Sequence, residues 1–186
     1  MTESTNNDSI KLFGTKNRSQ GLANENNPKV QKINNDSIIH SEIPELKELR
    51  LKNINRLIIG NLNINSIPNK FDQLKIIIKD KVDILLITET KLDSSFPENQ
   101  FLIPGFSKPF RKDRNRHGGG LLLYVREDIP AKELSRHTFS NDIEGMFIEV
   151  NLRKTKWLIL GTYHPPNQND EYFFQNVRNS LDTYCQ

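Results

Sequence analysis

The fold is decided by the stretch from Val82 to Thr90, which reads VDILLITET. Its centre, Ile84–Ile87, is a continuous apolar run without polar alternation. A continuous run of this kind between helices is typical of a central strand that is covered on both faces. The sequence therefore predicts a buried strand over residues 82–90.

A second strand and a helix precede this stretch. Residues Arg56–Asn65 carry the apolar group Leu57, Ile58 and Ile59 and predict another buried strand. Pro68 suits the first turn of a helix, and apolar residues follow it at helical spacing from Phe71 to Ile78. Strand, helix and strand in this order form a βαβ unit, so we expect the two strands to run parallel in one sheet.

The remaining residues predict further strands and a final helix. Leu121–Val125 is expected to form a strand after the triple glycine Gly118–Gly120, and the proline-rich segment Phe96–Phe110 a long loop. Met146–Leu152 and Trp157–Thr162 flank a polar turn and predict a hairpin. Asp170 is expected to cap a helix that carries three apolar residues on one face: Phe174, Val177 and Leu181. This order favours an α+β sandwich over a regular doubly wound sheet.

Composition divides the chain of 186 residues into two parts. The hydrophobic share of 35% is low for a globular chain. Residues 1–50 are polar, and their apolar residues keep no period, so this segment is predicted to be disordered, although a short helix over Ile39–Leu51 is compatible with its leucines. Residues 54–186 are predicted to form the folded domain.

Charge, cysteine content and hydropathy limit the partners and the cellular compartment that can be expected. The net charge of +3 fits either a polyanionic partner or a slightly basic solvated surface. Cys185 is the single cysteine, which excludes an intrachain disulfide and favours a reducing compartment. The sequence shows neither a secretory signal nor an apolar run long enough for a membrane span. We therefore expect an intracellular, non-secreted protein without a membrane partner, a setting that is compatible with the nucleus.

Three strand ends carry polar residues that could do chemistry: Asn63, Glu89 and Tyr163. A carboxylate at the exit of a buried strand costs free energy unless it is paired or holds a metal, and Mg²⁺ often binds one or two carboxylates while keeping water ligands. Each residue also has a structural interpretation. Glu89 could be solvated and paired with Lys91, Asn63 could form a turn, and Tyr163 could be an ordinary aromatic residue at the rim.

A basic cluster lies in the expected loop before the triple glycine and comprises Lys108, Arg111, Lys112, Arg114 and Arg116. Basic residues interleaved with Phe106 and Phe110 indicate contact with nucleic-acid phosphates, and the alternative is a solvated loop. The triple glycine lacks the spacing of a phosphate-binding loop, so it indicates close backbone packing or an unusual turn.

Several short motifs together resemble the opening of the endonuclease/exonuclease/phosphatase superfamily, and most of all the endonuclease of non-LTR retrotransposon reverse transcriptases. The resemblance covers roughly residues 56–183 and rests on the order of the motifs Leu62–Ile67, Asn69–Leu74, Val82–Leu92, Ile103–Phe106, Arg116–Gly120 with Tyr124–Val125, and Leu158–Pro166. It implies a partial four-layer α/β sandwich of the DNase I type.

The resemblance also implies roles for the three polar residues at the strand ends. Glu89 would bind Mg²⁺ or Mn²⁺, Asn63 would organise the metal and phosphate site, and Tyr163 would contact the scissile phosphate. The implied reaction is metal-dependent hydrolysis of a DNA phosphodiester, in a parent protein that continues into a reverse transcriptase region. DNA is the implied partner.

The sequence departs from the family in its later motifs, because neither a Gly-Asp-Phe-Asn nor a Ser-Asp-His segment occurs in it. None of its four histidines lies in a Ser-Asp-His segment: His40, His117, His137 and His164. The resemblance thus implies an N-terminal half whose C-terminal half is missing, with a weakly held metal and little or no activity alone. Two other interpretations remain: a non-catalytic nucleic-acid-binding or interaction fragment, and a relative that acts on small phosphate esters.

Overall fold

The computed structural model describes residues 44–134, 139 and 143–184, and these residues form a mixed α+β structure with three α-helices and two sheets. The predicted α+β class is confirmed. The elements in chain order are α1 (Pro44–Lys52), β1 (Ile59–Asn63), α2 (Phe71–Ile78), β2 (Ile84–Thr88), the short 3-10 helix η1 (Glu98–Phe101), β3 (Phe110–Lys112), β4 (Leu121–Val125), β5 (Ala131–Glu133), β6 (Glu144–Leu152), β7 (Thr155–Tyr163) and α3 (Asp170–Tyr184). Within these ranges, no helix has both the length and the apolar character that crossing a bilayer requires.

The larger sheet has the strand order β1-β2-β4-β3. Strands β1 and β2 pair in parallel, as predicted, and Asn63 lies opposite Thr88. Strand β4 runs antiparallel to β2, with Leu121 opposite Thr88. Helix α2 covers one face of this sheet, where Leu74 and Ile78 pack in one buried cluster with side chains of β2 and β4. Burial of β2 on both faces explains its uninterrupted apolar sequence.

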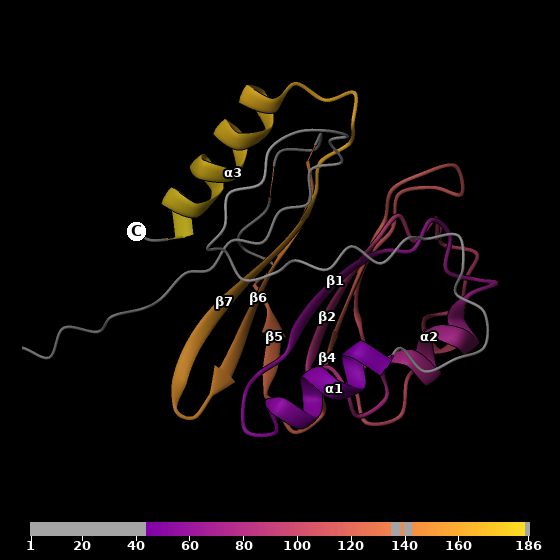
Figure 1. Cartoon of the computed structure of the whole chain (residues 1–186). Helices are drawn as coiled ribbons and strands as arrows, with labels where there is room; N and C mark the ends of the chain where they lie inside the picture. The colour runs from indigo at the N-terminus through magenta and orange to yellow at the C-terminus, as the bar shows by residue number, and fades with distance from the viewer. Residues whose placement is uncertain (1–43, 135–138, 140–142, 185–186) are drawn as a thin grey trace, which may run out of the picture.

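The smaller sheet, β5-β6-β7, packs against the opposite face of the larger one. Its inner side chains, including Met146, Ile148 and Val150, share a buried cluster with Leu86 and Leu123. Helix α3 packs on its outer face through Phe173 and Val177. The layers therefore follow the order α2, larger sheet, smaller sheet, α3, with the two helices on opposite sides of the sheets (Figure 1).

The short helix expected in the polar N-terminal segment is present as α1, which begins at Pro44. The rest of that segment, residues 1–43, lies outside the described residues. Arg50 attaches α1 to the larger sheet, because its guanidinium donates to the carbonyl of Lys81 and to the carboxylate of Asp83.

The details of α3 differ from the prediction in two ways. Its N-cap is Asn169 and not Asp170, since the Asn169 side chain accepts a hydrogen bond from the Tyr172 N–H at 2.9 Å. The buried aromatic residue is Phe173, and Phe174 is exposed. Phe173 and Val177 are four residues apart and therefore share the helix face that meets β7, whereas Phe174 is rotated away from it.

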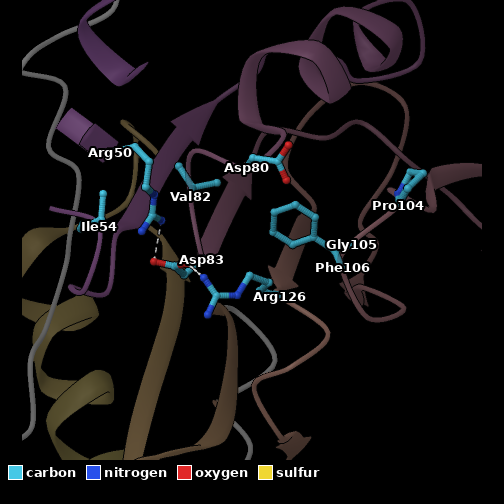
Figure 2. A pocket seen from close by; sticks show the side chains of 9 residues that line it. All are labelled: Arg50, Ile54, Asp80, Val82, Asp83, Pro104, Gly105, Phe106 and Arg126. Carbon is cyan, nitrogen blue, oxygen red and sulfur yellow. Dashed lines mark hydrogen bonds and ion pairs between the residues drawn. The ribbon is translucent and has the colours of Figure 1, made fainter. Parts of the chain in front are cut away.

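The buried carboxylate of Asp83 organises the start of β2. Its side chain is 2% exposed and forms ion pairs with Arg50 and Arg126, and it also accepts the Ile58 N–H at 2.7 Å. Figure 2 shows both arginines pointing toward Asp83. All three side chains line a pocket of about 400 Å³. This network lies at the opposite end of β2 from Glu89.

Replacement of Asp83 by Asn should lower the free energy of unfolding by about 3 kcal/mol, because two guanidinium groups lose their shared buried carboxylate. Urea unfolding followed by circular dichroism measures the change. The matched control is Asp128→Asn, which removes an exposed carboxylate that also pairs with Arg126. This variant should lose less than about 1 kcal/mol of the free energy of unfolding. Equal losses in the two variants would contradict a special role for the buried network.

Candidate functional site

The ends of five strands meet at one rim of the two sheets. Parallel pairing brings the ends of β1 and β2 to the same level, and Glu89 follows β2 directly. Because β4 runs antiparallel to β2, the triple glycine that precedes β4 also reaches this rim. From the smaller sheet come the first residue of β6, Glu144, and the last residue of β7, Tyr163, which pair with each other.

Two consecutive glycines at this rim each bind a different carboxylate. The Gly119 N–H donates to the Glu89 carboxylate at 3.0 Å, and the Gly120 N–H donates to the Glu144 carboxylate at 2.6 Å. Both glycines have positive φ angles, 72° and 86°. A β-carbon would overlap the Glu144 carboxylate at Gly119 and the Thr90 hydroxyl at Gly120. The triple glycine was predicted to permit close backbone packing or an unusual turn, and Gly119 and Gly120 show both features.

Tyr163 lies near Glu89 at the rim of the two sheets. Burial raises the pKa of Tyr163 well above its usual value, the nearby Glu89 carboxylate raises it further, and the charge of Glu144 adds to this, while the charge of Arg114 opposes it. Tyr163 is therefore a neutral hydrogen-bond donor at physiological pH.

Asn63 lies on the same side of the larger sheet as these groups. Alternation along β1 places Asn63 with Ile59, which packs against the smaller sheet, whereas Leu62 packs on the α2 side. Its side-chain oxygen accepts the Asn65 N–H at 3.1 Å. The turn-forming role considered for Asn63 is thus present in the structure, and its side-chain NH₂ has no hydrogen-bond partner among the described residues.

The backbone is strained at this rim. Seven described residues other than glycine have positive φ angles, and four of them lie here: Asn65, Ser66, Glu89 and Lys91. Main-chain hydrogen bonds hold the strained turns together, including one of 2.8 Å from the Ser66 N–H to the Glu89 carbonyl. Strain that the surrounding structure fixes in place is a recurrent feature of functional sites.

The five side chains of the basic cluster do not share one free loop, because Phe110–Lys112 forms the edge strand β3. Each of them binds a protein group: Lys108 binds Glu98, Arg111 binds Asp113 and two carbonyls, Lys112 binds the Gly145 carbonyl, Arg114 binds Glu144, and Arg116 binds Asp93 and Ser95. The prediction that the whole cluster lies in a loop is therefore wrong for Arg111 and Lys112, and contact with nucleic-acid phosphates stays a prediction. Most of these cations fix the local chain.

Sequence reasoning missed Glu144, since the expected strand began only at Met146. A signal was available in the hairpin itself. A two-residue turn at Arg153 and Lys154 pairs Leu152 with Thr155, and counting outward from this pair places Glu144 opposite Tyr163.

The donor atoms at this rim fit Mg²⁺ in kind. Glu89 and Glu144 supply carboxylate oxygens, and Asn63 supplies an amide. The hydroxyls of Thr88 and Thr90, which flank Glu89, are buried and have no hydrogen-bond partner among the described residues. Among the residues that the structure describes, no three His, Cys, Asp or Glu side chains are grouped to hold a metal.

Replacement of Gly120 by Ala should lower the free energy of unfolding by about 3 kcal/mol, because the new methyl group meets the buried Thr90 hydroxyl in a left-handed backbone. The matched control is Gly105→Ala, since Gly105 has a similar φ of 84° and open space around it. It should lose only about 1 kcal/mol. Urea unfolding of both variants checks this, and equal losses would show that close packing at Gly120 contributes nothing.

Comparison with known proteins adds no family to this description. No family model matches the chain, and no curated protein matches it.

Proposed function

We propose that this chain supplies the Asn63, Glu89 and Tyr163 part of a Mg²⁺-dependent endonuclease site of the non-LTR retrotransposon type. The observation that carries the proposal is that Glu89 and Tyr163, which come from different sheets, lie at one rim, where the Glu89 carboxylate raises the pKa of Tyr163. The motifs that contain these residues belong to the resemblance.

The layer order supports the finer fold that the proposal requires, a DNase I-like four-layer sandwich. Helix α2, the two packed sheets and helix α3 stack in the order that such a sandwich needs. The polar strand ends then gather at one rim of the paired sheets, where loops can admit an extended substrate.

The residues have distinct tasks in this proposal. Glu89 would bind the cation, and Tyr163, which burial keeps neutral, would donate a hydrogen bond to a phosphate oxygen. Asn63 would present its side-chain NH₂ to the same phosphate. When bound, Mg²⁺ supplies charge neutralisation for the phosphate and leaving oxygens. The strained turns fix these donors before substrate arrives.

The proposed reaction also needs general acid and base groups. The family's Gly-Asp-Phe-Asn and Ser-Asp-His motifs do not occur in the 186 residues. We therefore propose that DNA nicking requires a continuation of the chain that carries them, leading into the reverse transcriptase region. The 186 residues alone are proposed to be inactive or nearly so.

Nicking of supercoiled plasmid with Mg²⁺ tests the proposal, using the chain as given and the same chain extended by the reading frame that follows codon 186. The extended chain should nick. Its Glu89→Gln variant should lose about 100-fold or more in rate, because a metal contact contributes several kcal/mol to the transition state. The matched control, Glu48→Gln, removes an exposed carboxylate of α1 and should leave the rate unchanged.

Failure of the extended chain to nick with Glu89 intact would overturn the proposal. Binding of DNA without nicking would then favour the second candidate, a non-catalytic nucleic-acid-binding fragment, which the basic residues near the rim support. Hydrolysis of small phosphate esters in place of DNA would instead indicate a phosphatase-like relative.

A further inference from the structure

Arg114 differs from the other members of the basic cluster in what it binds and where it lies. We propose that Arg114, held in place by Glu144, is the phosphate-binding cation of the rim and receives a phosphate oxyanion beside Tyr163. The identification of that phosphate as part of a DNA backbone rests on the proposed function.

The unused hydrogen-bond donors single out Arg114. A guanidinium has five N–H groups, and among the described residues only Nη1 of Arg114 is engaged, by Glu144 at 2.6 Å. Arg111 uses all three of its nitrogens on carbonyls and on Asp113. Arg116 uses two nitrogens and also stacks on Phe96. Arg114 therefore retains the fork of donors that binds a phosphate in a bidentate manner.

The position of Arg114 at the rim is the second argument. Its side chain lies against Gly119, the residue whose N–H binds Glu89. Its charge also acts on the Tyr163 hydroxyl. The Arg114 side chain is 48% exposed, so its unused donors can meet a ligand that approaches Tyr163 from solvent.

Glu144 is suited to position Arg114 without saturating it. The Glu144 side chain is 14% exposed, and one of its oxygens accepts the Gly120 N–H at 2.6 Å. The other oxygen accepts a single donor of Arg114. Because the Gly120 N–H holds the Glu144 carboxylate in place, Glu144 orients the Arg114 guanidinium. The other N–H groups of Arg114 stay available for a ligand.

A cation is also needed at this rim on electrostatic grounds. Glu89 and Glu144 both place negative charge near Tyr163, and an approaching phosphate would be repelled by them. Arg114, which forms an ion pair with Glu144, brings positive charge to this rim. It offsets this repulsion where the phosphate would sit.

Fluorescence anisotropy of a labelled DNA duplex of about 20 base pairs, titrated with the full chain in EDTA at several salt concentrations, tests the proposal. Arg114→Gln should weaken binding about fivefold or more and lower the slope of log affinity against log salt by about one. Arg114→Lys should recover part of the loss, because it restores the charge without the fork. Unchanged urea midpoints show that the variants are folded.

The matched control is Arg116→Gln, which removes the same charge from a side chain that is 61% exposed and anchored to Asp93. It should change affinity less than about twofold. Equal losses for Arg114→Gln and Arg116→Gln, or no loss for either, would overturn the proposal, because general surface charge would then explain binding.

Glu144→Gln separates positioning from simple charge. Removing a negative charge near DNA strengthens binding if charge alone matters. The positioning role predicts the opposite result, a weaker complex, because Gly120 and Arg114 donate to different oxygens of Glu144, and the NH₂ of Gln would replace one of these acceptors. Unchanged or tighter binding by this variant would overturn the role of Glu144.

Inorganic phosphate as a second probe keeps this inference separate from the proposed nuclease function. Phosphate binding that depends on Arg114, without DNA binding, would support the anion site and count against DNA as its ligand. Arg114-dependent DNA binding by an extended chain that does not nick would also support the site, while the nuclease proposal alone would fail.

Discussion

Two consecutive peptide groups, the N–H groups of Gly119 and Gly120, bind two different carboxylates, and the geometry of the rim depends on them. Glu89 comes from the larger sheet and Glu144 from the smaller one. The glycines thus fix the distance between the sheets at the point where their polar ends meet. Only glycine fits there, because both backbones are left-handed and their β-carbon positions are occupied by neighbouring side chains.

Strand β2 connects this rim to the most deeply buried ion network that the structure describes. Asp83 precedes the strand and forms ion pairs with Arg50 and Arg126. Glu89 follows the strand, accepts the Gly119 N–H and lies near Tyr163. The apolar residues between them lock the strand between α2 and the smaller sheet. The same stretch therefore provides stability at one end and polar, strained, partly accessible groups at the other.

The strand-helix-strand unit, strand β4 and the hairpin of β6 and β7 could be predicted from the sequence, because long periodic or continuous apolar runs specify them locally. The short strands β3 and β5 could not, since three residues are too few to show a period. Glu89 and Tyr163 were found because strand ends and motif order mark them. The partners of Arg111, Arg114 and Asp83 were not predictable, because contacts between distant segments leave no local pattern.

The proposed function depends most on the binding of a divalent cation by Glu89. Titration of the chain with Mn²⁺ in an amide NMR experiment tests this most directly, because the paramagnetic ion broadens only nearby signals. If Glu89 binds the cation, the Gly119, Gly120 and Thr90 amide signals should be lost early and selectively, and they should persist when Glu89 is replaced by Gln. Uniform broadening of amide signals over the whole surface would contradict cation binding by Glu89. The same selective loss in the variant that lacks the Glu89 carboxylate would also contradict it.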